Sequence, residues 1–467
     1  MIFKRTKIVC TIGPASSSPE MLTDMIRAGM NVARLNFSHG THEEHENVIR
    51  AIRHAADALG EPVAILQDLQ GPKIRAGVLP KEGVELKAGG RVTFTTGETA
   101  IDGLRLPVTY ENLHQDVKAG ERILLDDGLL SAKVIEVKDR DVICEVIDGG
   151  ILTSHKGVNF PDSKLSISPI TEKDKADLVF GVAQGVDFVA LSFVRSPREI
   201  HELRALINDP SIRVVAKIEK REAVACMDEI IEAVDVIMVA RGDLGIEMEA
   251  ERVPIVQKQL IARCRAASKP VIVATQMLDS MIRNPRPTRA EVSDVANAVI
   301  DHADAVMLSG ETAGGAHPLE AVTIMAKIAL ETEASVFDDV AVESHAGAVS
   351  PEEAVSEIAN VLARETDAKA VLVASATGDL GRTVSRFRPE MPIVVATDDP
   401  KVRRQLAVTW GVLPILQKRT KNADDFFKHG AEALKKLGAA KTGDKVVVVG
   451  GNPIGPLADR VEIRELA

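Results

Sequence analysis

This sequence of 467 residues contains few aromatic residues and no excess of positive charge. It has one tryptophan and one tyrosine, and aromatic residues make up only 3% of the chain. Scarce aromatic side chains argue against recognition of nucleic acid by base stacking. The formal net charge of −11 at pH 7 argues against binding to a phosphate backbone. We therefore expect no nucleic-acid partner.

Cysteines and long apolar runs are also scarce. The 4 cysteines stand singly, without the spacing of metal ligands, and we expect them to be reduced. No apolar stretch approaches the length of a membrane span. Residues 8–12 are too short for the core of a signal peptide. These absences favour a cytoplasmic protein without a membrane partner. The length of the chain suggests several domains.

What the sequence does contain is a strand-like pattern that recurs along the chain. Runs rich in Val, Ile and Leu occupy residues 7–12, 31–37, 63–67, 188–193, 214–218, 236–240, 271–274 and 305–308. Continuous apolar runs are typical of parallel strands that are buried on both faces. Segments with helical spacing follow most of them, at residues 19–29, 43–59, 197–208, 250–267 and 289–301. This alternation predicts a (β/α)8 barrel, or TIM barrel.

Two regions depart from the barrel pattern. Residues 72–168 contain short strand-like pieces separated by turns, which predict a small β-barrel domain inserted as a hinged lid. Residues 351–467 contain a helix followed by alternating strands and helices, which predict a C-terminal open α/β sheet. The barrel domain then comprises residues 1–71 and 169–340.

Charged residues cluster at the carboxyl ends of the predicted strands, where such barrels carry their active sites. Lys217 and Glu219 end one apolar run and point to the same side of the strand. Asp243 follows the next run. Two carboxylates, completed by substrate oxygens and water, are the usual protein contribution to a Mg²⁺ site. The alternative is that Glu219 and Asp243 form structural salt bridges with Lys217 and Arg241.

Other residues at the strand ends suit an anionic substrate. Arg34 lies inside a buried strand and, with Arg75, can neutralise a transferring phosphoryl group. Gly242 precedes a helix, so free amides there favour a carboxylate, although a tight turn also explains the glycine. Thr275 and Ser309 end the last two strands. Their hydroxyls can relay a proton or act as structural caps, and the residues alone leave both readings open.

Over essentially its full length, the sequence resembles the pyruvate kinase family. The matching phrases lie at residues 7–16, 33–40, 71–75, 156–159, 216–219, 240–245, 274–278 and 308–313. The resemblance implies Mg²⁺-dependent phosphoryl transfer from phosphoenolpyruvate to ADP, giving pyruvate and ATP in the last step of glycolysis. It also implies a second Mg²⁺ that accompanies the nucleotide, and a homotetramer whose C-terminal domain serves regulation and oligomerisation.

The resemblance also implies roles for single residues. Lys217 would stabilise the enolate and the moving phosphoryl group, while Arg34 contacts the phosphate. The backbone at Gly242 and Asp243 would hold the substrate carboxylate, and Thr275 lies where the enolate takes up its proton. The expected catalytic residues are Lys217, Arg34, Thr275, Arg75 and Ser309. The expected Mg²⁺ ligands are Glu219 and Asp243, and the expected nucleotide-binding residues are Asn36, His39, Arg75 and Lys156.

Two departures from the family pattern carry expectations of their own. Lys73 stands where many members have Glu, and Leu69-Gln70 stands where they have Thr-Lys. In members with Glu, a monovalent cation is held by groups matching Asn36, Ser38, Asp68 and the carbonyl of Leu69. We expect Lys73 to place its ammonium in or near that region, so that K⁺ is not required.

The second departure lies in the C-terminal domain. An effector loop that binds phosphate is expected at Ser375, Thr377, Gly378 and Arg382. Asp379 stands where a small hydroxyl residue is common, so we expect weak or absent activation by sugar phosphates.

Two other functions compete with this reading. A Mg²⁺-dependent carbon–carbon lyase would share Glu219 and Asp243 but would not need a lid that carries Lys156. An effector-binding scaffold with a decayed site would have lost at least one of Lys217, Glu219, Asp243 and Arg34, and all are present.

Overall fold

A computed structural model describes residues 3–97, 104–338, 350–420, 422–450 and 460–467. Its centre is a closed barrel of parallel strands in the order β1-β16-β15-β14-β13-β12-β3-β2. The strands are β1 (Lys7–Ile12), β2 (Val32–Asn36), β3 (Ala64–Asp68), β12 (Phe188–Leu191), β13 (Arg213–Ile218), β14 (Val236–Ala240), β15 (Val271–Ala274) and β16 (Ala305–Leu308). The predicted TIM barrel is confirmed.

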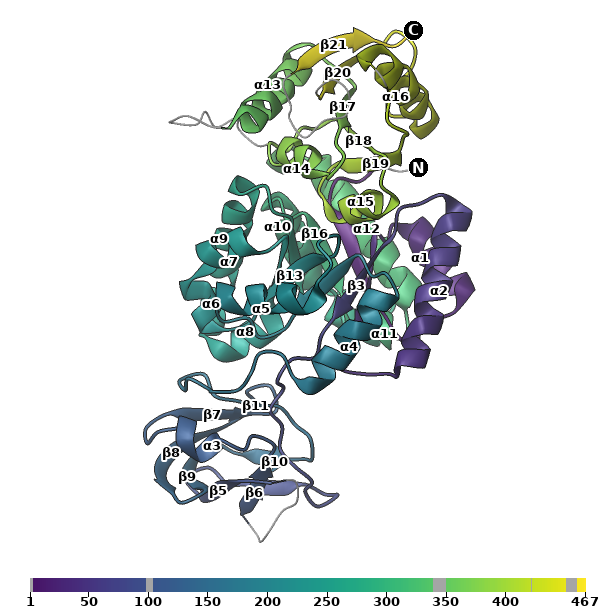
Figure 1. The fold of residues 1–467 in the computed structure, drawn as a ribbon. Coiled ribbons are helices and arrows are strands. Elements are labelled where there is room, and N and C mark those ends of the chain that lie inside the picture. Colours follow the sequence, from purple (N-terminus) through teal and green to yellow (C-terminus); the bar gives the residue numbers. More distant parts are fainter. Residues whose placement is uncertain (1–2, 98–103, 339–349, 421, 451–459) are drawn as a thin grey trace.

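Helices surround the barrel (Figure 1). They are α1 (Pro19–Ala28), α2 (His42–Leu59), α4 (Glu172–Ala183), α5 (Pro197–Ile207), α6 (Arg221–Ala225), α7 (Met227–Ala233), α8 (Arg241–Glu247), α9 (Val253–Ala266), α10 (Arg289–Ile300), α11 (Gly310–Ala313) and α12 (Pro318–Glu333). Helix α2 shows why these segments are helical. Thr41 and Glu44 form a capping box at its start, and Gly60 ends it in the left-handed conformation.

Two predicted elements differ from the observed ones. Strand β12 ends at Leu191, two residues earlier than the apolar run suggests, because Phe193 takes a left-handed φ of 55°. The segment 250–267 divides into a 3₁₀ turn (Ala250–Arg252) and α9. Pro254 lies at the start of α9, where a missing amide hydrogen costs no helical hydrogen bond.

The lid consists of strands folded around a core of its own. One sheet has the order β11-β7-β8-β9-β5-β6, and β10 pairs with β4 in a second. Single-residue bridges from Ala76 to Val108 and from Arg75 to Gly157 join the two edges of the larger sheet, which curves it into a barrel. The elements are β4 (Val84–Leu86), β5 (Arg91–Thr96), β6 (Arg105–Val108), α3 (Leu113–Asp116), β7 (Arg122–Leu125), β8 (Leu130–Lys138), β9 (Asp141–Asp148), β10 (Gly150–Leu152) and β11 (Val158–Asn159).

The C-terminal region is a sheet with the order β19-β18-β17-β20-β21, in which only β21 pairs antiparallel among the described strands. Its elements are α13 (Pro351–Glu365), β17 (Ala370–Ala374), α14 (Asp379–Ser385), β18 (Ile393–Thr397), α15 (Pro400–Gln405), β19 (Val412–Leu416), α16 (Ala423–Leu437), β20 (Lys445–Val449) and β21 (Val461–Glu465). Figure 1 shows this region and the lid on opposite sides of the barrel.

The C-terminal region docks against the ends where the barrel strands begin. Arg404 donates to Asp187, which directly precedes β12, and Arg388 pairs with Asp304, which directly precedes β16. Val408 joins the hydrophobic cluster inside the barrel, to which all eight strands contribute. The carboxyl ends of the strands therefore stay open on the other side. Across the described ranges, no helix combines the length and apolar character needed to cross a membrane.

Candidate active site

The carboxyl end of β13 carries the centre of a charged cluster. Nζ of Lys217 lies 2.9 Å from Oε1 of Glu219 and 3.4 Å from Oδ1 of Asp68, at the end of β3. Lys217 also donates to the hydroxyl of Ser192 at 2.7 Å. Glu219 and Asp68 are each only 1% exposed. A partly buried ammonium thus joins two buried carboxylates from different strands.

A second cation, Arg34 on β2, contacts the carboxylate of Asp68. Nε of Arg34 donates to Oδ2 of Asp68 at 2.6 Å, and its Nη1 donates to the hydroxyl of Thr11 at 2.9 Å. Asp68 therefore holds Lys217 and Arg34 side by side. Burial alone would raise the pKa of Asp68, but the charges of Lys217 and Arg34 lower it below its usual value.

The electrostatic balance leaves Glu219 as the less compensated carboxylate. Burial raises the pKa of Glu219 to about 7, and Asp243 acts in the same direction, while Lys217 opposes both. Burial would lower the pKa of Lys217, but Asp68 and Glu219 raise it above its usual value. Lys217 therefore stays charged. The excess negative charge lies between Glu219 and Asp243, where a cation would relieve it.

The carboxylates fit a divalent cation that also binds substrate. Oε2 of Glu219 accepts from the amide of Phe193 at 2.6 Å, which orients the group. No hydrogen bond of good geometry reaches the buried Oε1 from the described residues, although Lys217 lies near it. Among all residues that the structure describes, no three His, Cys, Asp or Glu side chains gather as a complete metal site. Two carboxylates would thus leave most ligand positions to substrate oxygens and water, as Mg²⁺ prefers.

Arg241 bears on one half of the salt-bridge reading of this cluster. It does not pair with Asp243, because its guanidinium binds Asp294 at 2.7 Å and the carbonyl of Thr275 at 2.9 Å. Of the two structural salt bridges that compete with a metal site, the one between Glu219 and Lys217 is present at 2.9 Å, whereas the one between Asp243 and Arg241 is not formed. Asp243 itself lies in the first turn of α8 and lines the cavity described below.

Thr275 lies beside the start of α8. The amide of Gly242 donates to its Oγ1 at 2.8 Å, and that hydroxyl donates to the carbonyl of Ala274 at 2.6 Å. Thr275 has a φ of 71° and Gln276 a φ of 54°. A positive φ is a genuine outlier for a β-branched residue and costs about 1–3 kcal/mol. The fold holds this hydroxyl next to the Gly242 amide despite that strain.

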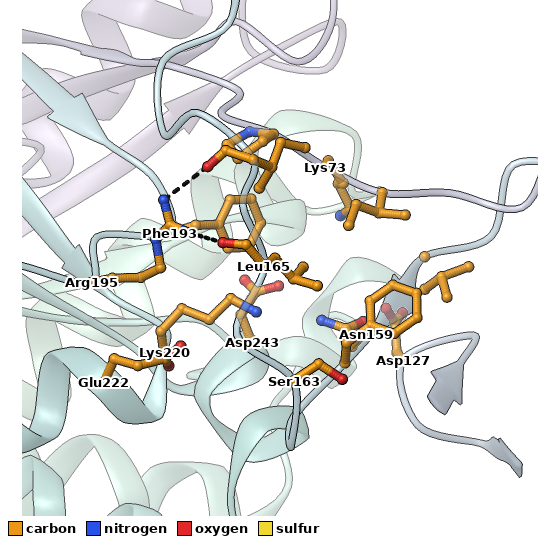
Figure 2. A pocket seen from close by; sticks show the side chains of 16 residues that line it. Lys73, Asp127, Asn159, Ser163, Leu165, Phe193, Arg195, Lys220, Glu222 and Asp243 are labelled. Carbon is orange, nitrogen blue, oxygen red and sulfur yellow. Dashed lines mark hydrogen bonds between the residues drawn. The ribbon is translucent and has the colours of Figure 1, made fainter. Parts of the chain in front are cut away.

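A cavity of about 50 Å³ lies between the lid and the barrel (Figure 2). Asn159 and Asp127 of the lid face Lys220 and Asp243 of the barrel across it. Arg195 fastens the returning lid segment, because it donates to the carbonyls of Leu165 and Ile167 at 2.9 Å each. The charged cluster thus adjoins a cleft with one wall on each side of the hinge.

The expected nucleotide residues divide between the barrel and the lid, and none of the four lines this cavity. Asn36 ends β2 on the barrel, and its side chain accepts from the amide of Ser38 at 3.1 Å. The carbonyl of His39 accepts from His45 at 2.9 Å. On the lid, Arg75 donates to the carbonyl of His155 at 2.9 Å, and Lys156 pairs with Asp126 at 2.7 Å. No contact in the described ranges joins the lid pair to Lys217.

Lys73 and Ser309 lie in less expected surroundings. Lys73 is exposed at the lid hinge, lines the cavity, and makes no ion pair with any described residue. Both carboxylate oxygens of Asp68 are engaged by Lys217 and Arg34 instead, and the carbonyl of Leu69 accepts from Ser192. The amide of Ser309 donates to Glu311, while its buried hydroxyl has no partner among the described residues.

The predicted effector loop is closed on itself. Asp379 accepts from the hydroxyl of Thr377 at 2.6 Å and pairs with Arg382 at 2.6 Å. Arg382 also donates to the carbonyl of Thr377. Gly378 takes a φ of 81°, and Ser375 is buried at the end of β17. The carboxylate of Asp379 thus accepts the hydrogen bond from Thr377 that a bound phosphate would need.

Sequence reasoning gave no role to four residues of this region. Ser192 bridges Lys217 and the carbonyl of Leu69. Lys220 pairs with the buried Glu247 at 2.6 Å, and Asn159 of the lid approaches the same carboxylate at 3.4 Å. Lys220 directly follows Glu219, which was a usable signal. Glu247 gave none, because it is one acidic residue within a helix.

A TIM barrel with a charged cluster at the carboxyl ends of its strands is typical of one class of protein, the TIM-barrel enzymes, which carry their active sites there. Comparisons make the assignment specific. Residues 3–322 match the pyruvate kinase barrel domain, and residues 353–459 match the pyruvate kinase alpha/beta domain. The chain therefore belongs to the pyruvate kinase family, as the motifs indicated.

Relatives and a solved structure agree with this assignment. Pyruvate kinase from Geobacillus stearothermophilus is 45% identical over 97% of this chain and 78% of its own length. The enzyme from Clostridium acetobutylicum is 43% identical over 96% of both chains. A crystal structure of a pyruvate kinase from Cryptosporidium parvum has a TM-score of 0.94 at 35% identity, covering 99% of this chain and 96% of that one. The chain is thus a phosphotransferase that uses phosphoenolpyruvate and ADP in glycolysis.

Proposed function

We propose that Lys217, Glu219, Asp243 and Arg34 form the centre at which phosphoenolpyruvate gives its phosphoryl group to ADP. The observation that carries this proposal is the buried contact of Lys217 with both Glu219 and Asp68. A permanently charged ammonium at this point can stabilise the oxygen that becomes negative when the C–O–P bond breaks. Arg34, held by Asp68, neutralises the transferring phosphoryl group.

The family generally uses Mg²⁺ and often K⁺. In this chain, Glu219 and Asp243 would hold the Mg²⁺ of the acid substrate, and a second Mg²⁺ would arrive with the nucleotide. The bound ion would offset phosphate and carboxylate charge. Glu219 suits this role because its Oε1 accepts no well-directed hydrogen bond from the described residues.

The remaining residues position substrate and proton. The amides of Gly242 and Asp243, at the start of α8, would bind the substrate carboxylate once the Gly242 amide leaves the hydroxyl of Thr275, to which it donates in this structure. The hydroxyl of Thr275 lies 2.8 Å from the Gly242 amide and is therefore close to that carboxylate. This position suits delivery of a proton to the enolate, directly or through water. Ser309 would assist from the last strand.

Closure of the lid would complete the nucleotide site. Residues 72–168 would rotate about Gly71 and Ser168 and bring Arg75 and Lys156 towards Asn36 and His39 on the barrel. Exclusion of water would then strengthen each electrostatic contact. Asn159 already approaches Glu247 across the cleft, at 3.4 Å. That contact suits a guide for the closing motion.

We also propose that K⁺ is not required. The expected cation region is lined by Asn36, Ser38, Asp68 and the carbonyl of Leu69. Asp68 already has two cationic partners, so a monovalent cation would add little compensation. Lys73 lies on the hinge and would approach this region when the lid closes, where it would repel a bound K⁺.

The K⁺ proposal is tested by activity with and without KCl, in tetramethylammonium buffer at constant ionic strength. Activity that changes less than twofold supports it, and K⁺ dependence acquired by Lys73→Glu supports the role of Lys73. The exposed Lys81→Glu, on the lid, is the matched control. Activation of the wild type by tenfold or more would contradict the proposal.

We also propose an assembly, a cellular location and a division into domains for this chain. A homotetramer in the cytoplasm would match the family, with residues 1–71 and 169–340 as the catalytic barrel and 72–168 as the lid. Residues 351–467 would serve regulation and oligomerisation. Sedimentation velocity at micromolar concentration tests the oligomeric state.

The central proposal is tested by pyruvate release at increasing Mg²⁺ concentration. We expect Glu219→Gln to raise the half-activating Mg²⁺ concentration by tenfold or more with little change in thermal melting. The exposed Glu222→Gln, on the same segment, serves as the control. An unchanged Mg²⁺ optimum with a collapsed melting temperature would show a structural role instead.

A further inference from the structure

A second charged cavity lies between the C-terminal region and the barrel, away from the active site. It forms where the connection between α9 and β15 meets α14 and the segment that follows it. Its volume is about 10 Å³, and its lining comprises Arg265, Ser268, Lys269, Pro270, Asp304, Arg382, Arg386, Arg388 and Thr409.

Two buried donors on its wall have no acceptor among the described residues. They are Nε of Arg388 and Oγ1 of Thr409. Arg388 is 6% exposed and Thr409 only 1%. The other nitrogens of Arg388 are engaged, because Nη1 donates to the carbonyl of Ser385 and Nη2 to Asp304 and the carbonyl of His302. Buried unsatisfied donors are rare in native proteins, so an acceptor is expected here.

The lining residues carry more positive than negative charge, although Arg382, Arg386 and Arg388 are each paired with a carboxylate. Five lining residues are cationic, and Asp304 is the single carboxylate on the wall. Asp304 is already saturated, because it accepts from Arg388, from the amide of Val271 and from the amide of Trp410. Nζ of Lys269 donates to the neutral carbonyl of Val234 at 2.7 Å. Burial lowers the pKa of Lys269, with Asp235 opposing and Arg382 adding to that effect.

The volume and the donor set together select a guest. About 10–15 Å³ holds one atom the size of a water oxygen. A water molecule would bring no negative charge to the ammonium of Lys269, whose acceptor among the described residues is the neutral carbonyl of Val234. One oxygen of a larger anion fits this volume, and the anion also brings negative charge to the cations around it. Its remaining oxygens would lie at the mouth, beside the partly buried Lys269 and Arg382.

We propose that this cavity binds the phosphate group of a small anion, either inorganic phosphate or a phosphomonoester. One phosphate oxygen accepts from Nε of Arg388 and Oγ1 of Thr409. The others pair with the ammonium of Lys269 and the guanidinium of Arg382. Charge-assisted hydrogen bonds to phosphate of this kind are the strong ones. The site is distinct from the predicted effector loop, which uses Ser375, Thr377 and the amide of Gly378.

The position of the cavity gives such an anion a consequence for the barrel. Arg382 pairs with Asp379, and Arg213 at the start of β13 lies 3.8 Å from the same carboxylate. Lys269 precedes β15. An anion held between Lys269 and Arg382 therefore ties α14 to two barrel strands. We expect phosphate to raise the temperature of the transition in which the barrel and the C-terminal region melt.

Calorimetric titration of the full chain with inorganic phosphate, at constant ionic strength, tests the proposal. We expect Thr409→Val and Lys269→Met each to weaken binding to this site by tenfold or more. Lys436→Met removes an exposed lysine, and Thr377→Ala alters the effector loop, so both should bind as the wild type does. Phosphate bound at the active site contributes equally to all variants.

Two further outcomes are informative. Glycerol 3-phosphate that binds more tightly than inorganic phosphate, and is lost in Thr409→Val, identifies the ligand as a phosphomonoester, while the reverse order identifies inorganic phosphate. Lys269→Met remains decisive if Thr409→Val does not fold. Wild-type phosphate binding by both variants would overturn the proposal, as would loss of binding in Thr377→Ala alone.

Discussion

The two ends of the barrel use the same residue types in opposite ways. At the amino end, Asp187, Asp235 and Asp304 each directly precede a strand and accept a backbone amide from the neighbouring strand, at Ile65, Val214 and Val271. Each also pairs with arginine: Asp187 with Arg53 and Arg404, Asp235 with Arg204 and Arg213, and Asp304 with Arg388. Every oxygen there is occupied.

At the carboxyl end the pairing is incomplete. Glu219 accepts one backbone amide through Oε2, but Oε1 receives no hydrogen bond of good geometry from the described residues. The difference teaches which carboxylate is left open to a further ligand. Asp68, also at the carboxyl end, is saturated like the amino-end aspartates, whereas Glu219 is oriented through one oxygen and receives no well-directed hydrogen bond on the other, which suits the metal ligand proposed above.

The largest expected effect is a difference in kcat between variants at the two ends of β13. Lys217→Met should lower kcat by about 10²–10³-fold or more, because it removes a preorganised charge from the transition state. Arg213→Met, at the start of the same β13, should leave kcat within about threefold. Steady-state assays of both variants, with melting in Mg²⁺, test the comparison. Equal loss of kcat would show that the two ends are not functionally distinct.

The next effect is on stability. Asp304→Asn should lower the free energy of unfolding by about 3–5 kcal/mol, because it leaves Arg388 without its buried counter-charge. The side chains of this pair are 4% and 2% exposed. Asp367→Asn removes an exposed pair with Lys369 and should change stability by less than about 1 kcal/mol. Denaturant unfolding measures both, and kcat of the folded Asp304→Asn enzyme should stay near the wild-type value.

A smaller effect should appear as acid sensitivity at the amino end. Burial lowers the pKa of His302 to about 3, and Arg388 and Arg265 act in the same direction. Asp338, 3.5 Å away, favours the charged form but is outweighed. Between pH 6.5 and 3 the unfolded chain binds the extra proton, so stability falls as pH falls, by up to about 1.4 kcal/mol per pH unit.

Comparison of variants isolates this histidine from the carboxylates. His302→Gln should flatten the decline in stability between pH 6.5 and pH 4.5, relative to the wild type, while the exposed His201→Gln should not. Urea unfolding at several pH values provides the measurement. Parallel curves for the wild type and His302→Gln would show that His302 is not buried in its neutral form.

The smallest expected effect concerns the effector loop. Asp379→Asn removes a negative charge and weakens the hold on Thr377 and Arg382. We expect the wild type to respond weakly to sugar phosphates and the variant to shift its half-saturating phosphoenolpyruvate concentration by about twofold, on the order of 0.4 kcal/mol. Titration at subsaturating phosphoenolpyruvate tests this. A strong wild-type response would mean that Asp379 turns away when the effector binds.

Local patterns predicted much of this molecule. The barrel strands were readable because they are buried on both faces and therefore continuously apolar, and several bounds match within one residue. Lys217 and Glu219 were readable because charges directly follow such a run. Phe193 was not, because its left-handed φ depends on an amide contact with Glu219 across two strands. Glu247 and Thr409 were equally hidden, since their roles come from contacts between distant segments.

Val408 has a consequence for how the chain melts. It belongs to the C-terminal region but packs in the hydrophobic cluster that fills the barrel, whereas the described core of the lid contains residues of the lid segment alone. Removing the C-terminal region would uncover this end of the barrel interior, so the barrel is expected to lose stability without it, although the C-terminal sheet also has clusters of its own. The chain should therefore behave as two cooperative units rather than three, with barrel and C-terminal region melting in one calorimetric transition and the lid in its own.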